Sequence, residues 1–324
     1  MRIAITGEKG FIAQNLKRII INRGHEFVSL IDEKELAWKC KGTDEPCIYE
    51  NGEKVWSSSL SNNSVDILIH NAAVVGTDVV ALNTAHSTMS NVAGTHTIAR
   101  AATAANIPVC YIGTTVIYDT QNYQDSVITE TSSLNPRTFY GIQKLSAERI
   151  IKHNCNDWMI IRPLFAYGGL GDMNSLIAKS IYACKNNHKS IDMFLDPEKI
   201  KDYMHVDDFC NAVLTGCLSG RWGEDYNVAA ETPYNTREIV EIISKTTGFD
   251  VASAIKWYPK TDYLGNHVLS SRKFRSHTGW SPDISLDLGI QMSAQTIMSD
   301  TGKYNPLKYL NEAKEKGIDL TVYY

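Results

Sequence analysis

Two side chains with complementary acid–base chemistry stand four residues apart, at Tyr140 and Lys144. Residues with this spacing share one face of a helix. An ammonium beside a phenol favours the phenolate, so the pairing predicts that the pKa of Tyr140 falls from about 10 toward neutrality. Such a tyrosine can give or take the proton of a hydroxyl while a hydride moves at the carbon that carries it. A surface helix pair has the same spacing, so the pattern needs support from other motifs.

A second candidate follows the apolar run 109–113, where the chain reads Gly113-Thr114-Thr115-Val116-Ile117-Tyr118. A buried parallel strand that ends here places Thr114 at the carboxyl edge of a sheet, where ligands of such folds bind. The Thr114 hydroxyl can hydrogen-bond a substrate oxygen and share its proton with Tyr140. A threonine that caps a turn is the ordinary alternative.

A third motif, Gly7-Glu8-Lys9-Gly10-Phe11-Ile12-Ala13, lies between a strand and a helix. A sharp strand-to-helix turn directs backbone N–H groups and the positive helix end at a phosphate. Gly7 and Gly10 allow the backbone to approach a pyrophosphate, and Ala13 allows close packing of helix and sheet. The motif predicts dinucleotide binding at Gly7, Gly10, Phe11 and Ile12.

The elements that must position these motifs alternate between short apolar strands and amphipathic helices. The predicted strands are 2–6, 26–31, 65–70, 109–113 and 159–162, and the predicted helices include 81–105, 140–153, 175–185, 206–218 and 236–247. This alternation predicts an α/β fold, a Rossmann-type doubly wound parallel sheet with a smaller, mixed α/β substrate-binding lobe. We expect the dinucleotide-binding domain to span 1–165, with 206–228 returning to it, and the lobe to span mainly 166–324.

Bulk properties exclude several classes of protein. The chain has 324 residues, with 43% hydrophobic and 21% charged residues and a net charge of −4, so nucleic acid and membrane partners are not expected. Its N-terminus reads directly into the first strand and does not resemble a signal peptide. The seven cysteines are scattered without a CxxC, and the histidines lack metal spacing. We therefore expect no disulfide framework, no metal and a cytoplasmic location.

Further motifs fall in the same order as in a known family. They are His70-Asn71-Ala72-Ala73, Asn91-Val92-Ala93-Gly94-Thr95, Pro136 with Tyr140, Lys144 and Glu148, Arg162-Pro163 with Tyr167-Gly168, Asp202 to Asp208, Tyr226-Asn227-Val228 and Gly279-Trp280-Ser281-Pro282. With the three motifs above, the chain resembles the extended short-chain dehydrogenase/reductases, in the NAD-dependent epimerase/dehydratase group that modifies nucleotide sugars. The resemblance covers nearly the whole chain.

The resemblance implies a role for each matching residue. Tyr140 is the acid/base, Lys144 lowers its pKa and holds the cofactor ribose, and Thr114 is the hydroxyl partner. The implied cofactor positions also include Asn71, Ala72, Ala73 and Asn91. Family members pair as homodimers through the helices 81–105 and 140–153, where small residues such as Ala85, Ala93 and Ala101 permit close packing.

The cofactor is NAD or NADP, and the sequence favours NAD. The acid that holds the adenosine ribose is expected at the end of the second strand, where Ile31 stands and Asp32 follows. Asp32 can accept the two ribose hydroxyls. Lys34 could instead meet a 2′-phosphate, although Glu33 and Glu35 oppose it.

Departures from the family pattern narrow the reaction. Dehydratases of the family carry acids where Thr115 and Val116 stand, and certain epimerases carry a cysteine at the Val116 position. What remains is oxidation or reduction at one sugar carbon, C4, by a 4-epimerase or a 4-ketoreductase. The alternatives are a nucleotide-sugar 4,6-dehydratase and a non-catalytic nicotinamide-binding protein.

Two more departures concern the nucleotide diphosphate of the substrate. Phe165 replaces a family asparagine, and Lys201 replaces an arginine, which keeps the charge but loses the bidentate fork. Arg272 and Asn174 could compensate. The expected substrate-binding residues are Thr115, Asn174, Lys201 and Arg272.

Overall fold

The structure is a computed structural model that describes residues 1–30, 52–119, 127–169, 171–172, 175–187, 190–193, 196–258 and 268–300. The expected roles of Asp32, Lys34 and Asn174 therefore fall outside the described residues. No helix within the described ranges is both long and apolar enough to cross a membrane.

A six-stranded sheet forms the centre of the larger lobe. Its strands are β1 (Arg2–Thr6), β2 (Glu26–Val28), β3 (Ile67–His70), β4 (Val109–Ile112), β5 (Trp158–Pro163) and β9 (Glu224–Val228), in the order β2-β1-β3-β4-β5-β9. Every neighbouring pair is parallel. The strand order reverses between β1 and β3, and ligands bind outside the carboxyl ends of the strands at such a switch point. The predicted fold class is confirmed.

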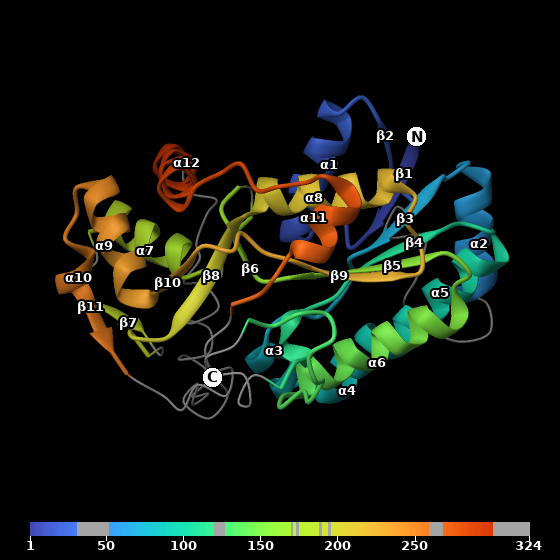
Figure 1. Ribbon diagram of the computed structural model, residues 1–324, viewed down its shortest axis with the longest axis horizontal. Coiled ribbons are helices and arrows are strands. Elements are labelled where there is room, and N and C mark those ends of the chain that lie inside the picture. The colour runs from blue at the N-terminus through green and yellow to red at the C-terminus, as the bar shows by residue number, and fades with distance from the viewer. Residues whose placement is uncertain are drawn as a thin grey trace, which may run out of the picture.

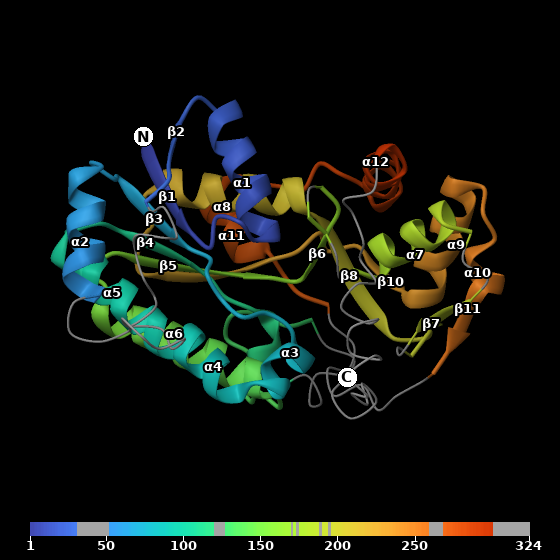
Figure 2. The same cartoon turned by 180° about the vertical axis from the view of Figure 1, so that it is seen from behind.

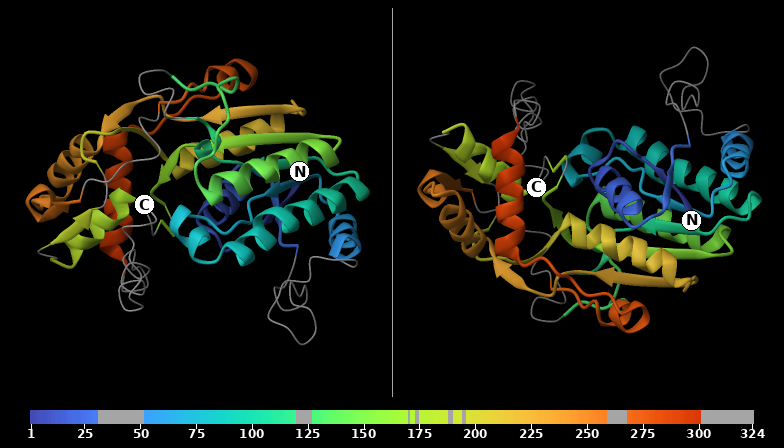
Figure 3. Two further views of the ribbon diagram at one scale, coloured as in Figure 1. Left: turned by 90° about the horizontal axis from the view of Figure 1, so that it is seen from below. Right: turned by 90° about the horizontal axis from the view of Figure 1, so that it is seen from above.

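Helices cover both faces of this sheet (Figure 1). One face packs against α1 (Phe11–Asn22), α8 (Val206–Ser219) and α11 (Arg272–Thr278), and the other against α2 (Gly52–Asn62), α5 (Thr95–Ala104) and α6 (Phe139–Asn154). Alternation along β1 explains the two cores, because Ile3 and Ile5 point to the first face and Ala4 to the second. On the second face, the teal and green helices α5 and α6 lie side by side (Figure 3, left).

A second lobe with its own apolar core lies at the end of the sheet where β5 continues into β6 (Figure 2). It contains the helices α7 (Leu176–Lys185), α9 (Thr236–Thr247), α10 (Val251–Ala254) and α12 (Leu286–Ser299). Its strands are β6 (Phe165–Tyr167), β8 (Ile200–His205) and β10 (Pro233–Asn235) in one sheet and β7 (Ile191–Met193) with β11 (Ile255–Trp257) in another. Between β8 and β10 the chain contributes α8 and β9 to the larger lobe. The domain boundaries stay a prediction.

The helix predicted over 81–105 is confirmed from residue 84 to residue 104, as a continuous helical run with one π-helical turn, and only its start is wrong, because Asn83 interrupts the segment. It contains α3 (Thr77–Leu82), α4 (Thr84–Thr88), the π-helix η1 (Met89–Gly94) and α5. Asn83 separates the first two with a non-helical φ of −144° and ψ of 72°, and its side chain accepts a hydrogen bond from the His86 backbone N–H at 3.1 Å. An asparagine at the N-cap favours the start of a new helix, because its side-chain oxygen accepts a backbone N–H that has no acceptor within that helix. The backbone of the capping residue is not helical, so the preceding helix ends there.

Candidate active site

Tyr140 and Thr114 form a pair of hydroxyls at the carboxyl edge of the sheet. Thr138 caps α6 by accepting the Gly141 backbone N–H at 3.0 Å, which sets Tyr140 in the first turn. Thr114 follows β4 and is 8% exposed. Burial raises the pKa of Tyr140 to about 12, and a side-chain hydrogen bond with Thr114 opposes this rise. The structure therefore brings together the two hydroxyls that the sequence predicted to share a proton.

Lys144 lies one helical turn further along α6. It is buried, its Nζ donates a hydrogen bond to the Ile112 carbonyl at 2.6 Å, and the same atom lies 4.3 Å from the centre of the Tyr111 ring. Burial lowers the pKa of Lys144 to about 7, while the Glu148 carboxylate opposes this. The expectation that Lys144 lowers the pKa of Tyr140 stays a prediction, because Lys144 is not among the groups that shift this pKa here. Desolvation controls the phenol, and the ammonium is directed at a backbone carbonyl instead.

The glycine turn has the shape that a pyrophosphate requires. Gly7 has a φ of +71°, and a Cβ there would lie 2.8 Å from the Ala72 Cα. Gly10 closes the turn by donating its N–H to the Gly7 carbonyl at 2.9 Å and then begins α1. The first turn of α1, which starts with Phe11 and Ile12, contains no acidic residue. These residues fit the phosphates of a dinucleotide, because a positive helix end meets a turn whose glycines are exposed.

A buried chain of hydrogen bonds holds the segment that faces this turn. Thr6 Oγ1 accepts the backbone N–H groups of Asn71 and Ala72 at 3.1 and 3.0 Å, so it donates its own proton to His70 Nδ1 at 2.7 Å. His70 Nε2 then donates to Thr95 Oγ1 at 3.0 Å, because the Thr95 hydroxyl donates to a carbonyl one turn earlier in the helix. Burial lowers the pKa of His70 to about 3, which agrees with a neutral ring.

Asn91 clamps the far end of the same segment. Its side-chain amide accepts the Val74 backbone N–H at 2.7 Å and donates to the Val74 carbonyl at 2.9 Å. It also donates to Gln143 Oε1 at 2.9 Å, next to Lys144 on α6. Because Asn91 is 1% exposed, its polar atoms serve the protein scaffold around Ala73.

Phe165 and Lys201, the two residues that depart from the family pattern at the expected diphosphate site, are neighbours in the structure. Lys201 on β8 is buried, and its Nζ lies 5.0 Å from the centre of the Phe165 ring on β6. Thr115 is 3% exposed, whereas Arg272 is exposed at the first position of α11. The structure thus brings Lys201 and Phe165 into contact through a cation–π interaction that their sequence separation does not reveal.

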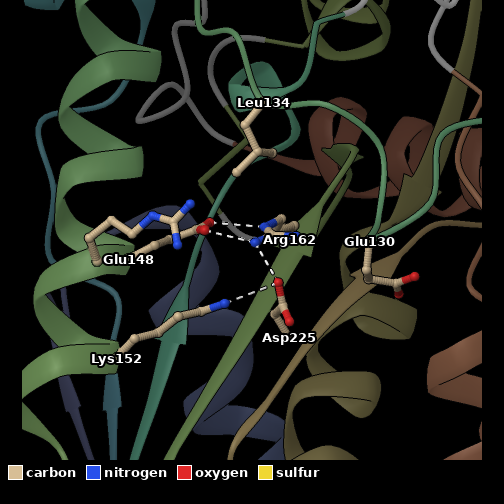
Figure 4. Close-up of a pocket in the computed structure, with 7 residues that line it drawn as sticks. Glu130, Leu134, Glu148, Lys152, Arg162 and Asp225 are labelled. Atoms are coloured by element: carbon tan, nitrogen blue, oxygen red, sulfur yellow. Dashed lines mark hydrogen bonds and ion pairs between the residues drawn. The ribbon is translucent and has the colours of Figure 1, made fainter.

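Elsewhere in the larger lobe, Arg162 is the centre of a buried ionic cluster (Figure 4). It donates to both carboxylate oxygens of Glu148 at 3.0 and 2.8 Å, to Asp225 at 2.7 Å and to the Tyr118 hydroxyl at 2.7 Å. Lys152 adds an ion pair to Asp225 at 3.2 Å. A cavity of about 210 Å³ adjoins this cluster. Because each charge has an opposite partner, the cluster serves to join α6, β5 and β9.

Sequence reasoning missed several residues of the site: Thr6, Thr95 and Gln143 in the polar network, and Glu8 in the glycine turn. Glu8 Oε2 accepts a hydrogen bond from Ser29 Oγ at 2.9 Å. An acidic residue inside the glycine turn was a signal that the sequence offered. Thr95 stood in a quoted motif, whereas Thr6 and Gln143 gave no signal, because threonines and glutamines are common at surfaces.

Comparison with known proteins agrees with this geometry. Residues 3–229 match the model of the NAD dependent epimerase/dehydratase family. The dTDP-glucose 4,6-dehydratase of Haemophilus influenzae is 23% identical over 91% of this chain and 97% of its own length.

Two solved structures share the fold. The dTDP-glucose 4,6-dehydratase of Streptomyces venezuelae, solved with NAD bound, has a TM-score of 0.79 at 21% identity, with coverage of 95% of this chain and 100% of that one. The UDP-glucose 4-epimerase of Thermotoga maritima, solved with UDP-glucose, has a TM-score of 0.77 at 19% identity, with coverage of 91% and 98%. The predicted family and nicotinamide cofactor are confirmed: the chain belongs to the NAD dependent epimerase/dehydratase family of enzymes.

Proposed function

We propose that this enzyme oxidises or reduces C4 of a nucleotide sugar, as a 4-epimerase or a 4-ketoreductase. The observation that carries the proposal is the hydrogen-bonded Thr114–Tyr140 pair beside the buried Lys144. Two hydroxyls that share a proton can bind one sugar oxygen and exchange that proton as the carbon changes oxidation state. The names of the relatives support a nucleotide sugar as the substrate.

The cofactor placement follows from the glycine turn. Gly7 and Gly10, with the backbone N–H groups of Phe11 and Ile12, would hold the pyrophosphate, and 71–73 would line the nicotinamide half. Lys144 would hold the ribose, and Asn91 would act by clamping 71–74. The bound nicotinamide supplies or accepts the hydride.

Tyr140 would donate the proton that the sugar oxygen takes up on reduction. Because its pKa is raised to about 12, the phenol is protonated at neutral pH and is ready to donate to a keto oxygen. Thr114 holds the same oxygen. Lys201 and Arg272 would bind the diphosphate, Thr115 would contact the substrate, and Phe165 would orient the Lys201 ammonium.

Among the described residues, the side chains that directly follow Thr114 give no support to dehydration. Thr115 and Val116 do not titrate, although elimination of water needs a positioned acid and base. Asp119 forms an ion pair with Arg137 at 3.6 Å. Asp172 accepts the Gly168 backbone N–H at 2.8 Å and both the N–H and hydroxyl of its neighbour Ser175. Both carboxylates thus have partners within the protein, Asp119 in an ion pair and Asp172 in hydrogen bonds.

The test is a product analysis. The purified enzyme is incubated with UDP-, GDP- and dTDP-hexoses, and with their 4-keto forms plus reduced cofactor. We expect inversion at C4, detected by NMR without a mass change, or a gain of two hydrogens by the keto sugar. A hexose product that has lost one water would show a 4,6-dehydratase, as the names of several relatives suggest. Cofactor that stays bound through purification favours the epimerase.

Assembly and location belong to the same proposal. A homodimer through α6 is supported by exposed apolar side chains: Phe139 is 59% exposed and Ile142 is 49% exposed. Ala85 is exposed as expected, but Ala101 was wrongly chosen, because it is fully buried against the sheet. A cytoplasmic location stays a prediction from the cysteines.

A further inference from the structure

One contact of the glycine turn reaches toward the neighbouring strand. Glu8 directly follows Gly7 and is partly buried, and Ser29 directly follows the last residue of β2. The Ser29 hydroxyl donates to Glu8 Oε2 at 2.9 Å. A carboxylate is thereby held between the phosphate-binding turn and the carboxyl end of β2.

This is the place where a dinucleotide bound to such a fold puts its adenosine ribose. The pyrophosphate lies on the helix N-terminus, and an acid at the end of the second strand accepts the ribose 2′-hydroxyl. A carboxylate offers about four lone-pair positions, so the bond from Ser29 orients Glu8 and leaves acceptor capacity for a hydroxyl. A 2′-phosphate in the same place carries a charge of about −1.5 to −2 and accepts hydrogen bonds only, so Glu8 repels it.

We propose that Glu8 selects NAD over NADP, with Ser29 as the residue that positions it. The inference rests on the cofactor placement proposed above and is independent of the sugar reaction. The neighbouring Lys9 and the positive end of α1 attract negative charge, but the pyrophosphate that they attract is common to both cofactors. Only the 2′-substituent differs, and Glu8 is the charged group that Ser29 holds beside it.

The test measures binding without a sugar substrate. Dissociation constants for NADH and NADPH are determined by calorimetry for the wild type, for Glu8→Gln and for a matched control, Glu26→Gln. Glu26 lies on β2 and forms an ion pair with Arg2, so the control removes the same charge from the neighbouring strand. We expect the wild type to bind NADH at least about tenfold more tightly, and Glu8→Gln to reduce this preference about tenfold, mainly through tighter NADPH binding. Glu26→Gln should keep the wild-type preference.

Three further measurements sharpen the result. Higher salt should weaken the preference of the wild type and leave that of Glu8→Gln unchanged, because salt screens an exposed charge. Ser29→Ala should move the preference in the same direction as Glu8→Gln, by a smaller factor. Cofactor that is carried through purification is released by heat and identified by chromatography, and we expect NAD.

A wild type that prefers NADPH, or an unchanged preference in Glu8→Gln, overturns the inference. Gly7→Ala separates this failure from a failure of the cofactor placement, because its Cβ would collide with Ala72. If Gly7→Ala abolishes binding of both cofactors while Glu8→Gln changes nothing, the placement stands and only the role of Glu8 is wrong. If Gly7→Ala binds normally, both are wrong.

Discussion

Two adjacent turns of α6 carry buried charged groups that make very different contacts. In the first, the Lys144 Nζ meets a backbone carbonyl and an aromatic ring, and its pKa falls to about 7. In the next, Glu148 receives two hydrogen bonds from Arg162, which also bonds Asp225. Both side chains are shielded from water, so the partners, and not burial alone, make the difference.

The contrast distinguishes, within one helix, a turn that stabilises the fold from a turn that is suited to proton transfer. A buried charge with a complete set of partners holds its protonation state and joins the elements around it. Burial of an ammonium without an acidic partner in contact lowers its pKa, and for Lys144 the value falls to about 7, where proton transfer is efficient. We therefore expect changes in the Lys144 turn to affect turnover and changes in the Glu148 turn to affect stability.

The largest effect on stability should come from Arg162→Met. Removing the guanidinium leaves Glu148 buried without its partner, and we expect a loss of about 3–5 kcal/mol in the free energy of unfolding. Denaturant titration measures it. The matched control is Lys152→Met. Its partner Asp225 still forms an ion pair with Arg162 in this variant, so the free energy of unfolding should fall by only about 0–1 kcal/mol. Equal losses in the two variants would remove the distinction between the turns.

Tyr140→Phe should lower turnover by at least about 100-fold, because the ring remains packed but the acid/base hydroxyl is gone. Binding of NADH should remain within about threefold of the wild type, since the change removes no phosphate contact. Thr114→Val should act in the same direction with a smaller loss. Near-normal turnover of Tyr140→Phe would refute the catalytic assignment.

Lys144 should make stability depend on pH. Its pKa is about 7 in the folded protein and 10.5 ordinarily, so between these values the unfolded chain binds a proton that the folded chain does not. The free energy of unfolding should therefore rise with pH by about 1 kcal/mol per unit from pH 7.5 to 9. Lys144→Met should lose this rise, and Lys152→Met should keep it. Parallel curves for the wild type and Lys144→Met would contradict the low pKa.

The smallest effect concerns the outward face of the same helix. Ile142→Glu places a charge on an exposed apolar position and should convert a dimer to a monomer with little change in stability. Light scattering at micromolar concentration measures the mass. A wild type that is already a monomer would count against the four-helix interface.

Much of the fold was predictable from local pattern. Alternation in β1, the glycines at 7 and 10, and the four-residue spacing of Tyr140 and Lys144 are short-range features, and each appears in its expected element. The helix break at Asn83 was missed. Asn83 caps the next helix by accepting the His86 N–H, but it lies within a run of apolar residues and alanines that by itself favours one continuous helix. Here the side-chain bond overrode helix propensity.

The amino-acid sequence by itself determined the parallel α/β order and the residue types at the strand ends, because both depend on neighbours a few positions apart. Only the tertiary structure decided what those residues contact. The Thr6–His70 bond, the Lys201–Phe165 contact and the Glu8–Ser29 bond each join segments that lie far apart along the chain. The pKa values of Tyr140 and Lys144 were decided in the same way, because desolvation comes from the surrounding packing and not from spacing along a helix.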